Sequence, residues 1–192
     1  LAFKPIDGLY LSLDMYNVAV DDRIVYSSAI GSSDTTSAVG AILNDYNVTS
    51  IKFFTNAVSS TTKGMDFVAS YSGLEIGPGS LDLSVSYNSN TTELGDKITT
   101  PTPISSSGAD IFDRKEQSRL VSARPSSKLL LGLDYSMGKL SVGLNNTQFG
   151  EVTWQHASDA SMDQTFSSKL VTDLNLNYQV SDNLSVNLAL NN

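Results

Sequence analysis

The feature that most constrains the fold of this chain is a regular alternation of apolar and small polar residues. It is clearest on either side of Asp182 and Asn183, where runs of alternating residues flank a two-residue turn signal. A period of two over such a length predicts β-strands. One face of this hairpin would carry Leu170, Thr172, Leu174, Leu176, Tyr178 and Val180, followed by Leu184, Val186, Leu188 and Leu190.

The same alternation recurs upstream. It is present in residues 9–16, 65–72, 81–88 and 128–135. Seven strands can be traced whole or nearly so, and Leu1 to Pro5 is expected to be the end of an eighth. The predicted fold class is therefore all-β, an antiparallel up-and-down meander of about eight strands.

The connections between these strands alternate in length. Short turns with Gly, Pro, Asp or Asn are predicted at Ile6–Gly8, Leu74–Gly79, Met137–Gly138 and Ser181–Asn183. Long polar stretches lie between them, at about Ser27–Ser50, Asn90–Gln117 and Gly150–Thr165. Short turns on one side and long loops on the other are typical of outer-membrane barrels, whereas alternation alone would also fit a soluble sandwich.

The two faces of the strands support the membrane interpretation. The polar face consists mostly of Ser, Asn, Asp and Gly, which suits a wide hydrated lumen or one filled by a separate plug better than a close-packed interior. Tyr71, Tyr135 and Tyr178 lie near short turns on the apolar face, where an interfacial aromatic girdle is expected. The alternative is that each is an ordinary strand tyrosine.

The composition excludes several classes of protein, but it does not distinguish a soluble β domain from a membrane barrel. The chain is 40% hydrophobic with a mean hydropathy of -0.08, which fits both a soluble β domain and a membrane barrel. It has no run of 18 apolar residues and no cysteine, so neither a transmembrane helix nor a disulfide framework is predicted. A net charge of -8 argues against nucleic acid as a partner.

Four segments of the chain read LYLSLDMYNVAVDDRIVYSS, IKFFTNAVSSTTKGMDFVASYS, SARPSSKLLLGLDYSMGKLSVGLNNTQFGEVTW and TFSSKLVTDLNLNYQVSDNLSVNLALNN. Together they resemble the C-terminal barrel region of TonB-dependent outer-membrane receptors. The resemblance rests on an Asp-Arg-Ile strand end, Phe-Phe-Thr-Asn before Lys-Gly-x-Asp, Pro-x-x-Lys, Phe-Gly-Glu and Lys-x-x-x-Asp-Leu. Each motif is degenerate alone, but the five occur in the family's order and cover nearly the whole chain.

This resemblance implies a bacterial outer-membrane protein surrounded by outer-membrane lipid. The parent barrel would have about 22 strands, a plug domain and a TonB partner. Residues 1–192 are expected to be roughly the last third of that barrel, an internal piece without the plug or the final strand. The parent would bind an extracellular nutrient, most often a ferric siderophore, and import it with TonB-coupled energy. No cofactor is implied.

Five loop residues are candidates for contact with such a ligand. Trp154 and His156 lie in the third long stretch, where they could touch an iron chelate, although a solvated loop histidine is the simpler interpretation and one histidine is no metal site. Arg23, Arg114 and Arg119 could bind an anionic ligand through charge-assisted hydrogen bonds. The alternative for these arginines is pairing with the nearby Asp21, Asp22, Asp110, Asp113 or Glu116.

Two local features carry further expectations. Asp34 to Asn47 has an N-cap-like Asp and helical spacing of apolar residues, which predicts a short loop helix. Gly64 follows a Ser/Thr run and predicts a bulge or a close approach of strands. Asp66, Asp134 and Asp173 are expected on the polar face, because a carboxylate facing lipid is costly.

No catalytic constellation is present, so an enzyme is not predicted. The chain lacks a nucleophile elbow, a phosphate-binding glycine loop and a His/carboxylate cluster. Two alternatives to a nutrient receptor stay open: a passive outer-membrane porin, and a soluble extracellular β-sandwich adhesin or binding module.

Overall fold

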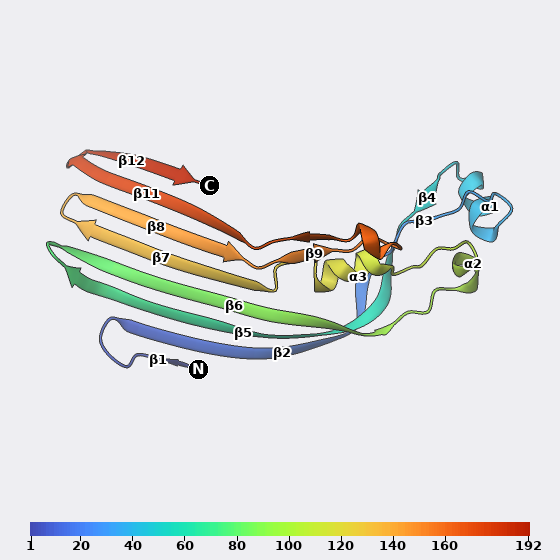
Figure 1. Cartoon of the computed structure of the whole chain (residues 1–192), viewed down its shortest axis with the longest axis horizontal. Coiled ribbons are helices and arrows are strands. Elements are labelled where there is room, and N and C mark those ends of the chain that lie inside the picture. The colour runs from blue at the N-terminus through green and yellow to red at the C-terminus, as the bar shows by residue number, and fades with distance from the viewer.

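The computed structural model describes residues 1–192 and contains one antiparallel sheet of eight strands that does not close (Figure 1). Each strand pairs with the strand that follows it in the sheet order, so the predicted meander is confirmed. In that order the strands are β1 (Ala2–Phe3), β2 (Leu9–Tyr26), β5 (Phe54–Ile76), β6 (Gly79–Lys97), β7 (Ser127–Met137), β8 (Leu140–Phe149), β11 (Lys169–Ser181) and β12 (Leu184–Asn191). The other two sheets have only two strands each and lie within the long connections, which argues against the β-sandwich.

Two-residue turns join three hairpins at one end of the sheet, called the turn end. Their central residues are Gly77 and Pro78, then Gly138 and Lys139, then Asp182 and Asn183. Gly77 and Gly138 have φ values of 60° and 56°, which side chains disfavour. The turn predicted at Leu74–Gly79 is too long, because β5 and β6 continue pairing up to Ile76 and Gly79.

The long connections all lie at the opposite end, called the loop end (Figure 1). The first loop (residues 27–53) contains β3 (Ile30–Gly31), α1 (Ala38–Asp45) and β4 (Ser50–Ile51). The second (residues 98–126) contains α2 (Thr102–Ser105) and α3 (Arg114–Val121), and the third (residues 150–168) contains β9 (Val152–Trp154), a 3-10 helix (Ala160–Met162) and β10 (Gln164–Phe166). The second loop was predicted to begin at Asn90, which is wrong because β6 stays paired as far as Lys97.

The register of the strands gives the sheet one apolar face and one polar face. One row of mutually paired residues crosses seven strands on the apolar face: Leu9, Tyr71, Leu83, Leu133, Leu144, Leu174 and Leu190. The adjacent row on the polar face is Tyr10, Ser70, Ser84, Gly132, Asn145, Asp173 and Asn191. The apolar residues predicted to share a face therefore do so, and much of that face is left uncovered. None of the helices is both long and apolar enough to pass through a bilayer.

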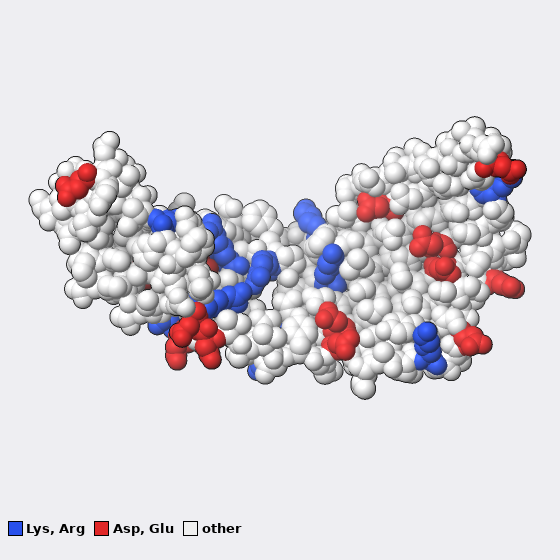
Figure 2. Space-filling view, turned by 180° about the vertical axis from the view of Figure 1, so that it is seen from behind, with Lys and Arg blue, Asp and Glu red and all other residues white.

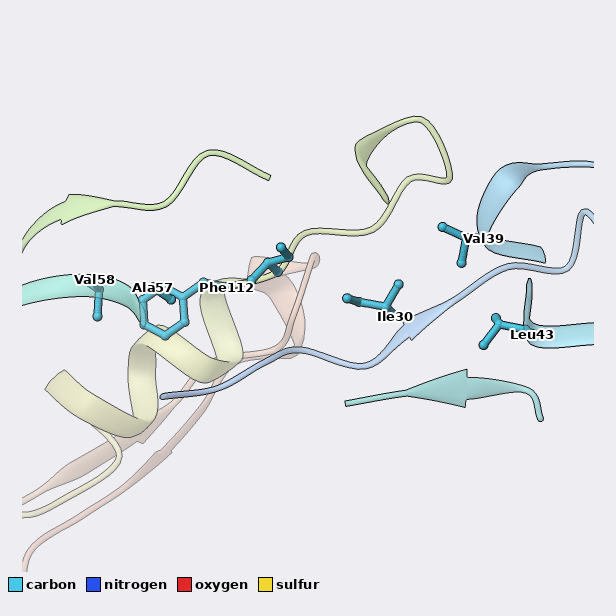
Figure 3. Packing of buried hydrophobic residues seen from close by; sticks show 7 residues of the cluster. Ile30, Val39, Leu43, Ala57, Val58 and Phe112 are labelled. Carbon is cyan, nitrogen blue, oxygen red and sulfur yellow. The ribbon is translucent and has the colours of Figure 1, made fainter. Parts of the chain in front are cut away.

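The buried apolar residues of the chain lie at the loop end, in the loops and in the adjoining part of β5. They are Ile30, Val39, Leu43, Ala57, Val58, Ile111 and Phe112. Figure 3 shows Ala57, Val58 and Phe112 near one another, with Ile30, Val39 and Leu43 farther along the loops. The loops and the adjoining end of β5 thus share one apolar core.

The predicted loop helix exists, but it begins later than expected. The N-cap of α1 is Ser37, whose hydroxyl accepts a hydrogen bond from the Gly40 N–H at 3.0 Å. Asp34 instead closes the preceding turn by accepting from the Thr36 N–H at 2.9 Å. A hydrogen bond from the Thr36 hydroxyl, and to a smaller extent the one from the Thr36 N–H, lowers the pKa of Asp34.

Gly64 marks a close approach and is not a bulge. It pairs in register with Tyr16 and with Asn90, and the ring of Tyr16 covers it. The register shifts on β5 lie elsewhere, between Val58 and Ser60 and between Tyr71 and Leu74.

The three predicted girdle tyrosines are on the apolar face near the turn end. Tyr71, Tyr135 and Tyr178 lie opposite Leu83, Leu81 and Leu140, respectively. The Tyr135 hydroxyl donates a hydrogen bond to the Ile76 carbonyl at 3.2 Å. Tyr135 and Tyr178 lie closer to the turn end than the row through Leu133 and Leu174, whereas Tyr71 lies within that row. The interfacial girdle therefore stays a prediction.

Candidate functional site

The helix α3 joins the three loops into one unit. The Ser28 N–H of the first loop donates to the Ile111 carbonyl at 2.8 Å, and the Ser28 hydroxyl accepts from the Asp113 N–H at 2.9 Å. At the other end of α3, the Ser122 hydroxyl donates to the Thr153 carbonyl of the third loop at 2.7 Å. These bonds hold the three loops together.

The start of α3 follows from its sequence. Asp113 is the N-cap, and its carboxylate accepts from the Glu116 N–H at 2.9 Å.

Glu116 itself is only 4% exposed and lies between two cations, with Lys52 Nζ at 3.2 Å and Arg119 Nη1 at 2.8 Å. A buried carboxylate needs such partners, so Glu116 ties the first loop to α3.

Arg114 links α3 to the third loop. Its guanidinium forms two bonds to the Asp163 carboxylate, at 2.7 and 3.3 Å, and a third to the His156 carbonyl at 3.2 Å. The same carboxylate accepts from the His156 N–H at 2.8 Å. The hydrogen bond from Arg114 is the main reason that the pKa of Asp163 lies below its ordinary value.

The imidazole of His156 is oriented by its own turn. Its Nδ1 accepts hydrogen bonds from the N–H groups of Ser158 and Asp159, at 3.4 and 3.1 Å. Trp154 meets the ring edge-on, with a centroid distance of 6.2 Å. The Ser161 hydroxyl bonds to Asp159 and lowers the pKa of that carboxyl.

A polar cavity of about 580 Å³ lies among the three loops. Its walls are Ser28, Ala29, Gly31, Lys97, Ser107, Gly108, Ala109, Asp110, Asp113, Arg114, Gln117, Ala157 and Ser158. Lys97, Arg114 and Gln117 supply hydrogen-bond donors, and Asp110 and Asp113 supply acceptors. The cavity is chemically suited to a polar ligand. The chain contains no group of three or more metal-ligating side chains.

The five predicted ligand contacts fall into separate places. Arg114 lines the cavity, and His156 lies beside it through its backbone. Arg119 points to Glu116, one of its predicted partners, whereas Arg114 pairs with Asp163, which was not among them. Arg23 lies on β2 and donates to the Ser60 hydroxyl at 3.0 Å, instead of pairing with a carboxylate. Trp154 belongs to β9 and contacts His156.

Lys97, Asp110 and Gln117 line the cavity but were not chosen from the sequence as ligand contacts. Lys97 was placed inside a loop, because the last third of β6 is rich in Thr, Glu and Asp and does not alternate. The signal that could have found these residues was the polar composition around them, which many surface loops share.

Comparisons with known proteins agree with this architecture. The family model described as "TonB dependent receptor-like, beta-barrel" matches residues 1–192. A solved structure described as "Structure of the FpvAI-pyocin S2 complex" contains a chain that matches 98% of this one, with a TM-score of 0.55 and 19% identity. At that identity the likeness concerns the fold alone, and this chain spans 22% of the matched chain's length. No curated protein sequence matches this chain.

Proposed function

This chain belongs to the TonB-dependent receptor-like β-barrel family, and we propose that it forms part of the wall and three extracellular loops of a bacterial outer-membrane receptor. The complete receptor binds an extracellular nutrient, for which we propose a ferric siderophore. It imports this nutrient into the periplasm with TonB-coupled energy. Its role is transport and not enzymatic catalysis.

The observation that carries this proposal is the separation of the two faces of the sheet. Leucines, valines and tyrosines run across seven strands on the apolar face, which meets lipid in the proposal. Five aspartates in regularly paired parts of the strands lie on the polar face, which lines the lumen in the proposal: Asp14, Asp66, Asp82, Asp134 and Asp173. In a soluble protein, so large an uncovered apolar face would be a liability.

The cavity among the loops is the proposed point of first contact with the nutrient. Arg114 and Lys97 supply positive charge there, and they could bind the anionic oxygens of an iron chelate. Arg23, Arg119, Trp154 and His156 remain proposed contacts of the same ligand.

The rest of the machinery belongs to the complete receptor. Residues 1–192 are proposed to be a C-terminal portion of a barrel of about 22 strands. A plug domain inside the lumen and the TonB protein are the proposed partners. The unpaired outer edges of β1 and β12 would then pair with further strands of the same barrel.

The test uses the complete receptor, purified from outer membranes in detergent. Heat-dependent migration on a gel would report a closed, detergent-resistant barrel. Uptake of radioactive iron, supplied as a ferric catecholate or ferric hydroxamate, should then require both the receptor and an energised inner membrane. Steady channel conductance without energy-dependent uptake would favour a passive porin instead.

A further inference from the structure

Phe149 lies between two lysines on the polar face at the loop end of the sheet. It is directly opposite Lys128 on β7 and directly opposite Lys169 on β11. The Lys128 ammonium stands over the Phe149 ring, 5.2 Å from its centroid, within the range of a cation–π contact. The sequence analysis did not single out any of these residues.

Neither lysine is neutralised by the protein. The four salt bridges of the chain involve the N-terminus, Lys52, Arg114 and Arg119, so Lys128 and Lys169 have no carboxylate partner. In the row of paired residues that crosses the sheet at Lys128, Asn88 lies between this lysine and the carboxylate of Asp66. Asp14 is the next residue of that row after Asp66. The Asn88 amide donates to Asp66 at 2.6 Å, so that carboxylate is already engaged.

Lys128, Phe149 and Lys169 lie at the ends of their strands that face the loops. Figure 2 shows most basic side chains of the visible face near the junction of sheet and loops, with acidic side chains on both parts. Strand β7 begins at Ser127, directly after the second loop, and the third loop begins at Gly150. The Ser127 carbonyl accepts a hydrogen bond from the Gly150 N–H at 2.9 Å. Lys128 and Phe149 therefore stand where both loops join the sheet.

The spacing of the strands sets the width of this group. Neighbouring strands lie about 4.8 Å apart, so the two lysine backbones are separated by about 10 Å with the Phe149 strand between them. An apolar ring flanked by two cations matches a ligand that carries anionic groups on two sides of an apolar body. Two ammonium groups on either side of the ring can pair with two anionic groups of one ligand at the same time.

We propose that Lys128, Phe149 and Lys169 form a binding site for polycarboxylates with an aromatic or apolar body. Its position on the lumen side rests on the proposed function, because that function makes the polar face the lumen wall. A ligand that leaves the loop cavity would meet this site next. The site is distinct from the cavity, whose lining includes none of the three residues.

The test is calorimetric titration of the complete receptor in detergent with benzene-1,3,5-tricarboxylate, and with the uncharged benzene-1,3,5-tricarboxamide for comparison. Lys128→Gln and Lys169→Gln should each weaken tricarboxylate binding by about tenfold, as expected for loss of one charge-assisted hydrogen bond. Lys63→Gln removes the same charge from the apolar face of β5, where Lys63 lies opposite Asn17 and Thr91, and should leave binding unchanged.

Further arms keep the result decisive. The double variant Lys128→Arg/Lys169→Arg retains both charges and should bind, so it serves if a glutamine variant does not migrate as a folded barrel. The site is refuted by absence of binding, by equal binding of the tricarboxamide, or by an equal loss in Lys63→Gln. If tricarboxylate binding depends on the lysines but the receptor imports no iron chelate, the site is supported and the proposed nutrient is refuted. If import is normal but no such binding is found, only the site is refuted.

Discussion

The phenol ring of Tyr16 lies over Gly64, its direct partner on the neighbouring strand, and fills the space that a side chain at Gly64 would need. The Ser89 carbonyl lies 2.8 Å from where the Cβ atom would be, so the opposite side is closed too. An aromatic ring covering a strand glycine restores the packing that glycine lacks. Only glycine therefore allows this arrangement.

Gly64→Ala should destabilise the barrel, because the added methyl group must displace the Tyr16 ring. Overpacking of this kind costs about 1–3 kcal/mol. The measurement is urea-induced unfolding of the complete receptor in lipid vesicles. Gly95→Ala is the control, since an added Cβ on this β6 glycine would meet nothing nearer than 3.5 Å. Equal unfolding free energies for the two variants would show that the ring does not confine Gly64.

Glu116→Gln should loosen the loop unit. The change removes the buried charge that Lys52 and Arg119 share, and it leaves both cations without an anion. Loss of such a partner costs about 1–3 kcal/mol, so the loops should open more often. We expect trypsin to cleave in the second loop about fivefold faster or more, since about 1.4 kcal/mol corresponds to a factor of ten.

The control for this cleavage experiment is Glu151→Gln. Glu151 is exposed and forms no salt bridge, so its replacement should leave the cleavage rate unchanged. An unchanged rate in Glu116→Gln would mean that the apolar core of the loops holds them without this carboxylate.

The link between α3 and the third loop should weaken in acid. The folded protein lowers the pKa of Asp163 through its hydrogen bonds with Arg114, below the ordinary value of 3.8. A lowered carboxyl pKa contributes stability that is complete above the ordinary value and is lost as the pH falls through the lower folded value. Pepsin, which is active in acid, should therefore cut the third loop increasingly below pH 3.8.

Asp163→Asn supplies the comparison at each pH and corrects for the pH dependence of the protease itself. The variant should be cut readily throughout, so the ratio of variant to wild-type cleavage should fall toward one in acid. A ratio that does not change with pH would exclude Asp163 as the titrating group.

The strands and their faces could be predicted because each strand's alternation of apolar and polar residues is visible in a short stretch of sequence. Residues 128–135 alternate by themselves, and register then aligns them with neighbours that alternate in the same way. Gly64 was expected to mark either a bulge or a close approach of strands, and the residue that covers it, Tyr16, lies on another strand. Strand pairing is needed to see that contact.

The loop unit could not be predicted because its contacts join residues that are distant in the sequence. Lys52 and Glu116 are 64 positions apart, and Arg114 and Asp163 are 49 positions apart. Nearby acids were the natural partners to consider, and this choice was right for Arg119 but wrong for Arg114. The N-cap of α1 was misplaced for a similar reason, since Asp34 and Ser37 are both good caps and only the folded turn distinguishes them.

Two leucines of β7 provide the sharpest test of which face meets lipid. Leu130 and Leu133 have nearly the same exposure, 38% and 39%, but Leu130 lies on the polar face and Leu133 on the apolar face. An arginine on the lipid face costs about 2–4 kcal/mol near the bilayer midplane, whereas a lumen position tolerates charge. Leu133→Arg should therefore reduce the amount of heat-shifting barrel in outer membranes severalfold, and Leu130→Arg should not. The reverse order would place the lumen on the apolar side and overturn the assignment of the faces.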